Sequence, residues 1–128
     1  MALKAFVVED NVSIRDSLIE ALSELTGIAT CGVAGSEKAA VAWLTDPANE
    51  WDLAIVDLIL EPGGSGLGVL HACRGRKPGR KVVVLTGAAN PEVRRQCEAL
   101  GSDRVFDKSI ETDALMDWCL ALAQAAPH

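Results

Sequence analysis

Five polar residues stand at the ends of apolar stretches of the sequence: Glu9, Asp10, Asp57, Thr86 and Lys108. Three of them are carboxylates, one is a hydroxyl and one is an ammonium. Clustered carboxylates repel one another and raise one another's pKa, so a group of three needs a counterion. Lys108 supplies one positive charge against three negative ones, and one divalent cation would neutralise the remainder. Because oxygen ligands prefer a hard ion, these residues predict a Mg²⁺ site.

The same residues suit the acceptance of a phosphoryl group. Asp57 is the expected nucleophile and would form an acyl phosphate. Lys108 and the metal would neutralise the phosphoryl oxygens, and the Thr86 hydroxyl would donate to one of them. A doubly charged group beside Thr86 can draw that hydroxyl inward and repack the space it leaves. The residues therefore predict a signalling switch, and no enzyme beyond the catalysis of its own phosphorylation and dephosphorylation.

Each residue also has a plain structural explanation. Asp10 with Asn11 could cap a helix, Asp57 could cap a turn, and Thr86 could satisfy a backbone donor. The combination favours a functional site, because the residues follow the strands that would flank one point of a sheet. In open α/β sheets, ligands bind beyond the carboxyl ends of the strands at such a point.

The elements that must position these residues follow from the hydrophobic pattern. Short apolar runs alternate with longer stretches of helical period, which gives five strand–helix units. The expected strands are 3–8, 28–34, 53–57, 81–85 and 104–107. The first expected helix has an apolar stripe and ends at Gly27; the stripe is Ile14, Leu18, Leu22 and Leu25. The second begins after the cap Ser36 and carries Ala40, Trp43 and Leu44. The other three are expected at 67–76, which follows a glycine-rich turn at 62–66, at 91–100 and at 111–124.

Strands that are apolar on both sides indicate a parallel sheet covered by helices on both faces. Right-handed crossovers leave few topologies for five such units. We therefore expect an α/β fold, a three-layer flavodoxin-like (βα)₅ sandwich with strand order 2-1-3-4-5. The 128 residues suit one domain, with a structured core over about 3–123 and a tail at 124–128.

With these residues and elements assembled, the sequence resembles the receiver domain of two-component response regulators. The resemblance covers about residues 3–123, and four short motifs carry it in order: Val7–Asp10, Ile55–Leu58, Val83–Gly87 and Val105–Lys108. The segment after Asp57 departs from the family pattern, because Pro62 stands one residue later than is common. We expect an altered loop there, with the site intact.

The resemblance implies that a histidine kinase or a histidine phosphotransfer protein passes a phosphoryl group to Asp57. Mg²⁺ would be held by Glu9 or Asp10, by Asp57 and by the backbone carbonyl of Ile59. Thr86 and Phe106 would form the switch, with Phe106 as its aromatic residue. The output would act on a partner protein or an output domain. The face made by 91–100, 104–107 and 111–124 is the expected output surface and a surface for a homodimer.

Two other classes of protein stay open at this point. One is a pseudo-receiver, a protein-interaction module that is never phosphorylated; the presence of Asp57, Thr86 and Lys108 argues against it. The other is a hydrolase of the haloacid-dehalogenase type, which also uses an aspartyl nucleophile. That type needs a second aspartate two residues after the first, where this sequence has Ile59.

Charge and composition exclude further classes. The formal net charge is −6, which argues against direct binding of nucleic acid or of an anionic membrane. No apolar stretch approaches the length of a membrane span or forms a signal peptide. The four cysteines contain no CxxC pair, so we expect reduced, mostly buried thiols in a cytoplasmic protein.

Overall fold

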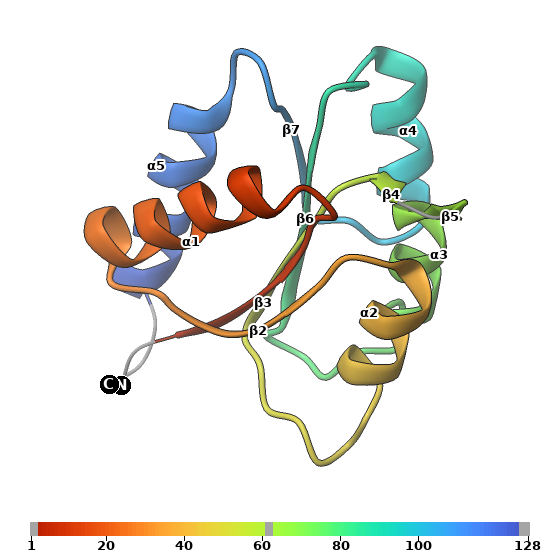
Figure 1. Cartoon of the computed structure of the whole chain (residues 1–128), viewed down its shortest axis with the longest axis horizontal. Coiled ribbons are helices and arrows are strands. Elements are labelled where there is room, and N and C mark those ends of the chain that lie inside the picture. The colour runs from red at the N-terminus through yellow and green to blue at the C-terminus, as the bar shows by residue number, and fades with distance from the viewer. Residues whose placement is uncertain (1–2, 61–62, 126–128) are drawn as a thin grey trace.

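A parallel sheet of five strands runs through the middle of the molecule, in the order β2-β1-β3-β6-β7 (Figure 1). The computed structural model describes residues 3–60 and 63–125. Counted along the chain, these strands stand in the order 2-1-3-4-5, which confirms the predicted flavodoxin-like arrangement. The strands are β1 (Lys4–Val8), β2 (Ala29–Ala34), β3 (Leu53–Val56), β6 (Lys81–Thr86) and β7 (Arg104–Asp107).

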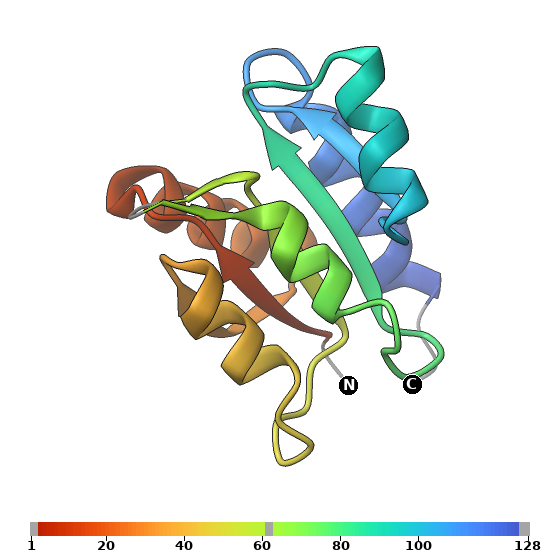
Figure 2. The ribbon, with the colours of Figure 1, turned by 90° about the vertical axis from the view of Figure 1, so that its right-hand side faces the viewer.

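Helices cover both faces of this sheet. α1 and α5 lie side by side on one face, and α2, α3 and α4 lie on the other (Figures 1 and 2). Three layers result, as the apolar character of the strands predicts. The helices are α1 (Val12–Thr26), α2 (Glu37–Leu44), α3 (Gly66–Ala72), α4 (Pro91–Ala99) and α5 (Thr112–Ala125).

Side-chain caps fix where the helices begin. Asn11, Ser36 and Asn90 each place a side-chain oxygen on the amide three residues later, at the start of α1, α2 and α4. Gly27 ends α1 in the left-handed region, with φ at 74°, and so confirms the predicted stop. These boundaries matter for the site, because α1 begins directly after the acidic pair at the end of β1.

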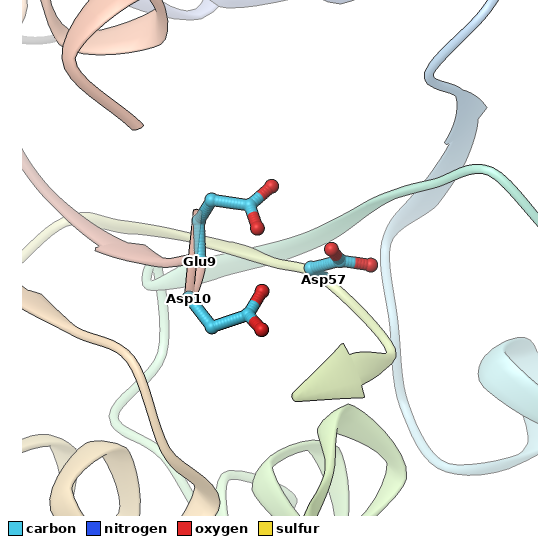
Figure 3. A group of neighbouring side chains, drawn as sticks. All are labelled: Glu9, Asp10 and Asp57. Atoms are coloured by element: carbon cyan, nitrogen blue, oxygen red, sulfur yellow. The ribbon is translucent and has the colours of Figure 1, made fainter. Parts of the chain in front are cut away.

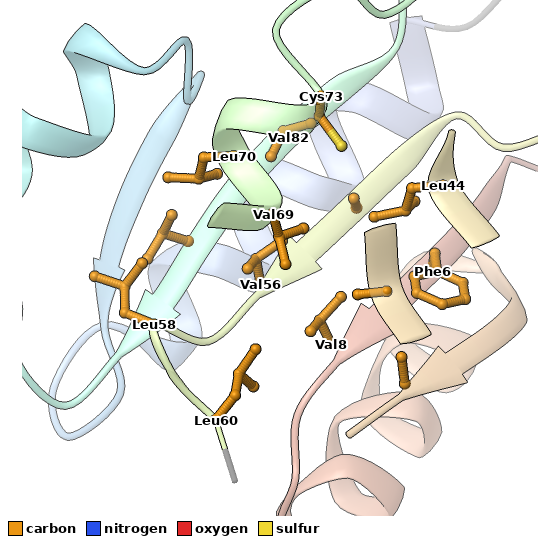
Figure 4. Close-up of a cluster of buried hydrophobic side chains, with 14 of the residues drawn as sticks. Phe6, Val8, Leu44, Val56, Leu58, Leu60, Val69, Leu70, Cys73 and Val82 are labelled. Carbon is orange, nitrogen blue, oxygen red and sulfur yellow. The ribbon is translucent and has the colours of Figure 1, made fainter. Parts of the chain in front are cut away.

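The sheet separates two apolar clusters. One lies under α2, α3 and α4 and includes Phe6, Val56 and Val82 (Figure 4). The other lies under α1 and α5 and includes Val83 and Phe106. Alternate residues of β1, β3, β6 and β7 enter alternate clusters, as the pleat requires. The indole of Trp43 on α2 stacks on the Phe6 ring, with ring centroids 4.4 Å apart.

The segment after Asp57 differs from the predicted glycine-rich turn. β4 (Ile59–Leu60) and β5 (Gly64–Ser65) pair antiparallel as a short hairpin, and α3 begins at Gly66. Two-residue strands are too short to show a period, so the hydrophobic pattern could not reveal them. Pro62, the basis of the expected change in this loop, lies outside the described residues.

Two helical predictions need adjustment. Leu18 and Leu22 of the predicted α1 stripe are buried, but Ile14 and Leu25 are 39% and 60% exposed. The stripe is thus shorter than predicted, because α1 packs against the sheet and α5 only over its middle turns. α5 ends at Ala125, beyond the expected core limit at residue 123.

Three of the four cysteines are buried and all four are free thiols, but Cys31 on the edge strand β2 is exposed. Burial raises the pKa of the Cys119 thiol to about 12, which fits a packing role. Within 3–60 and 63–125, no helix has the length and hydropathy to cross a membrane.

Candidate functional site

The carboxyl ends of four neighbouring strands bring the predicted residues together. Val8 of β1 pairs with Val56 of β3, so the residues that follow them, Glu9 and Asp57, emerge side by side. Thr86 is the last residue of β6, the next strand in the sheet. Lys108 follows β7, and its amide donates to the Thr86 carbonyl at 3.0 Å.

The three carboxylates form one cluster. Glu9, Asp10 and Asp57 each offer an oxygen within 4.8 Å of the others (Figure 3). Glu9 and Asp57 are only 4% and 6% exposed, and Asp10 is half-buried. The position of the cluster is imposed by parallel strand register and by the two consecutive acids at the end of β1.

Lys108 joins two members of the cluster. Its Nζ donates to Oε1 of Glu9 at 2.6 Å and to Oδ2 of Asp57 at 2.7 Å. Burial alone would lower the pKa of Lys108, but these two carboxylates outweigh it, and the pKa is raised. Burial raises the pKa of Glu9, and its bonds to Lys108 and to the Asn11 amide offset this only in part. The ammonium is therefore held charged between the two acids.

The donor set fits a divalent, oxygen-binding cation. Three carboxylates against one ammonium leave two formal negative charges, in a place where two of the carboxylates are almost fully buried. All the available ligand atoms are oxygens, as Mg²⁺ prefers. Ile59, whose carbonyl is the predicted backbone ligand, donates its own amide to Asp57 Oδ1 at 3.3 Å and so lies directly beside the cluster.

Thr86 is fully buried at the end of β6. Its Oγ accepts a hydrogen bond from the Ala88 amide at 3.3 Å, in the loop that leads to α4. This bond uses a lone pair and leaves the hydroxyl proton available to donate. A change at Thr86 is thus linked directly to the loop before α4.

Phe106 and Thr86 lie on adjacent strands but enter opposite sides of the sheet. The alternation of β6 places Thr86 on the side of Val82 and Val84, under α3 and α4. Phe106 belongs to the other cluster, fully buried, with its ring 6.4 Å from that of Trp118 on α5. This placement shows Phe106 packed in the core, and its role in a switch stays a prediction. Val105, which pairs with Val84, is the apolar β7 residue on the side of Thr86.

Arg94 connects α4 with β7 and with the start of α5 through hydrogen bonds. Arg94 of α4 donates to the carbonyl of Val105 at 2.7 Å and to Glu111 at 2.5 Å. The same Glu111 oxygen accepts the Asp107 amide at 2.9 Å. α4, β7 and the start of α5 are joined in this way. Sequence reasoning missed the pair, because 17 residues separate its members and no local spacing signals it.

Gly66 is a second residue that the sequence did not single out. Its amide donates to the Leu58 carbonyl at 2.9 Å, closing the base of the β4–β5 hairpin. A Cβ at this position would overlap the carbonyl oxygen of Asp57 and stand 2.8 Å from the Leu58 Cα. The glycine at this position could have indicated a close backbone approach, but the neighbouring glycines of 63–68 made it impossible to single out.

Comparison with known proteins agrees with this geometry. The chain is 33% identical to the response regulator RppA of Synechocystis sp. over an alignment 125 residues long. The alignment covers 90% of this chain and 53% of RppA, so the chain spans about half of RppA's length. Its fold is similar to the receiver domain of the Francisella response regulator 1452, with a TM-score of 0.80, 24% identity, and coverage of 95% of this chain and 97% of that one.

A second similar structure is the receiver domain of the sensor histidine kinase PA1611 from Pseudomonas aeruginosa, described with a magnesium ion coordinated in the active site cleft. The TM-score is 0.78 at 19% identity, with 98% of this chain and 100% of that one covered. The match to the family "Response regulator receiver domain" extends over residues 5–119. Because this match runs from β1 into α5 and includes every strand that carries the acidic cluster, the chain belongs to the response regulator receiver domains.

Proposed function

We propose that the chain is a single receiver domain that accepts a phosphoryl group on Asp57 and changes its surface in response. The observation that carries the proposal is the bridge from Lys108 to Asp57 and Glu9, at 2.7 and 2.6 Å, inside a cluster of three carboxylates. Such a cluster is costly to bury unless cations neutralise it, and perturbed titratable groups of this kind concentrate at functional sites. In a receiver site, each residue of the cluster has a role in metal binding or phosphoryl transfer.

Glu9, Asp10, Asp57 and the Ile59 carbonyl would hold Mg²⁺, which when bound would neutralise oxygens of the incoming phosphoryl group. A carboxylate oxygen of Asp57 attacks phosphorus, and the P–N bond of a phosphohistidine breaks. The electron pair of that bond goes to the imidazole nitrogen, which takes up a proton. Lys108 transfers its hydrogen bond from Asp57 to a phosphoryl oxygen, and the Thr86 hydroxyl donates to another.

The response follows from the position of Thr86. Drawing its hydroxyl toward the phosphoryl group breaks the bond from the Ala88 amide and shifts the loop before α4. Arg94 transmits that shift, since it contacts the loop at the Ala89 carbonyl as well as β7 and α5. The proposed output surface is therefore α4, β7 and α5, either against a partner protein or output domain or in a homodimer.

The phosphoryl donor must approach from the open side of the acidic cluster. Exposed apolar side chains stand at the loops and helix ends around it, among them Val12 (56%), Ile59 (62%) and Ile110 (81%). A groove of about 640 Å³ between α1 and α5 borders Lys108. An apolar helical surface of a histidine kinase or a histidine phosphotransfer protein would fit this rim.

Intact mass spectrometry after incubation with acetyl phosphate and Mg²⁺ tests the proposal. Wild type should gain one labile phosphoryl group, and Asp57→Asn should gain none, because an amide is a poor nucleophile. Asp16→Asn, which changes an exposed acid on α1, is the matched control and should behave as wild type. No adduct on wild type would favour the pseudo-receiver, and continuous phosphate release from many phosphate esters would favour the hydrolase. An adduct that persists in Asp57→Asn would show that another residue is the acceptor.

A further inference from the structure

The carboxylate of Glu37 reaches from α2 to the hairpin beside the acidic cluster. Its Oε1 accepts a hydrogen bond from the Ser65 amide at 2.8 Å, across 28 residues of sequence. Glu37 is the first residue of α2, directly after the cap Ser36. Because Ser65 in turn caps α3, this bond connects the starts of two helices through the hairpin.

Ser65 is the residue that faces Ile59. The two pair directly across the antiparallel hairpin of β4 and β5. Ile59 also donates its amide to Asp57 and carries the carbonyl expected to bind Mg²⁺. Glu37 therefore holds the strand that is paired with the strand of the backbone ligand. A shift of Ser65 would be passed to Ile59 by the hairpin.

Two glycines make room for this carboxylate. A Cβ at Gly68 would overlap Oε2 of Glu37, and a Cβ at Gly64 would stand 3.0 Å from the Glu37 Cβ. The side chain of Glu37 thus fills a space that larger residues at either position would take. Its place against the hairpin is fixed from several sides rather than by a single bond.

We infer that Glu37 is a positioning residue for the Mg²⁺ site and sets its affinity through the hairpin. This inference rests on the proposed function, because it assigns the support of one ligand of that same site. A hydrogen bond to an ionised acceptor is stronger than a neutral one, which suits a contact that must hold a two-residue strand in place. Residues that orient metal ligands commonly change metal affinity 10–100-fold when removed.

A simpler role would be to complement the dipole of α2, since acids in the first turn of a helix are stabilising. That role predicts a loss of stability with no change in Mg²⁺ affinity. Glu92 provides a control, because it is also an acid in the first turn of a helix, α4, but has no contact with the hairpin among the bonds of the described residues. Comparing the two residues separates helix stabilisation from positioning.

The experiment is a Mg²⁺ titration by calorimetry on the full chain, with thermal unfolding measured without Mg²⁺ on each variant. Glu37→Ala should raise the Kd for Mg²⁺ roughly tenfold. Glu37→Gln should keep a Kd near that of wild type, because an amide oxygen still accepts from Ser65. Glu92→Ala should leave the Kd unchanged. Gly68→Ala, which crowds Glu37 without removing it, should weaken Mg²⁺ while Gly75→Ala should not.

An unchanged Kd in Glu37→Ala, with wild type binding Mg²⁺ normally, would overturn the positioning role and leave the proposed function intact. Equal weakening by Glu37→Gln and Glu37→Ala would also overturn it, because charge alone would then explain the effect. If Glu37→Ala does not fold, an unchanged Kd in Gly68→Ala would count against the role in the same way. Absence of Mg²⁺ binding in wild type would instead overturn the metal site itself.

Discussion

Gly66 occupies the point where the start of α3 passes closest to the phosphoacceptor candidate. Any Cβ there would press on the backbone of Asp57 and Leu58, neither of which can rotate away. We expect Gly66→Ala to destabilise the fold by roughly 1–3 kcal/mol, as overpacking of well-filled sites does. Urea unfolding would measure this. Gly75→Ala, at a glycine with open space around it, is the control and should change the midpoint little.

Ile59 and Ala88 lead to a prediction about how long a phosphoryl group would persist. Hydrolysis of an acyl phosphate needs a water aligned opposite Asp57, and neither side chain can hydrogen-bond a water. Ile59 is 62% exposed, so a polar replacement has room there. We expect Ile59→Asn and Ala88→Glu to shorten the half-life roughly tenfold, which is about 1.4 kcal/mol in the barrier. Release of labelled phosphate from the phosphorylated protein gives the rate. Equal rates in both variants and wild type would contradict the role of water alignment.

At the scale of elements, the joint of α4, β7 and α5 predicts a pH dependence. The Arg94 guanidinium, together with the Asp107 amide, holds the pKa of Glu111 below its usual range, with a weaker contribution from Arg104. A lowered folded-state pKa contributes stability above the unfolded-state pKa, and that stability is lost as pH falls through the folded-state value.

The melting temperature of wild type should therefore exceed that of Glu111→Gln most clearly at pH 7. The difference should shrink as the pH drops below the ordinary value of 4.5 and through the lowered pKa of folded Glu111. Circular dichroism melts at several pH values would follow it. Glu24→Gln, at an exposed acid on α1, is the comparison variant and should show no such trend. A difference that grows on acidification would reverse the assigned sign.

The elements also show where sequence reasoning succeeds and where it stops. Apolar strands, the Ser36 cap and the Gly27 stop are local signals, and all of them appear in the structure. The β4–β5 hairpin was not predicted because its strands are two residues long, and because one of its hydrogen bonds goes to a distant side chain, Glu37. The side of the sheet that Phe106 enters was not predicted either, since its spacing from Lys108 along the chain does not determine that side.

For the whole molecule, the buried acidic cluster predicts that Mg²⁺ stabilises the fold. A ligand that binds only the native state adds RT ln(1 + [L]/Kd), which is about 2.7 kcal/mol at a hundredfold excess over Kd. For a domain of this size that is roughly 10 °C in melting temperature. Scanning calorimetry with and without Mg²⁺ would measure it, with Ca²⁺-free buffer throughout.

The shift should disappear in Asp57→Ala and in Asp10→Ala, which remove members of the cluster. Asp16→Ala changes the net charge by the same amount outside the cluster and should keep the full shift. Equal shifts in all four proteins would mean that Mg²⁺ acts through general screening of a chain with a formal charge of −6 rather than at this site.

The separation of the two apolar layers by the sheet gives the protein its own optical reporters. Trp43 and Trp51 belong to the layer beneath α2, α3 and α4, whereas Trp118 belongs to the layer of α1 and α5. The chain contains no tyrosine, so its near-ultraviolet emission comes from these three indoles. A protein with Trp43→Phe and Trp51→Phe would emit from one side of the sheet, and one with Trp118→Phe from the other. Fluorescence alone would then reveal which side of the sheet responds when a ligand arrives at Asp57.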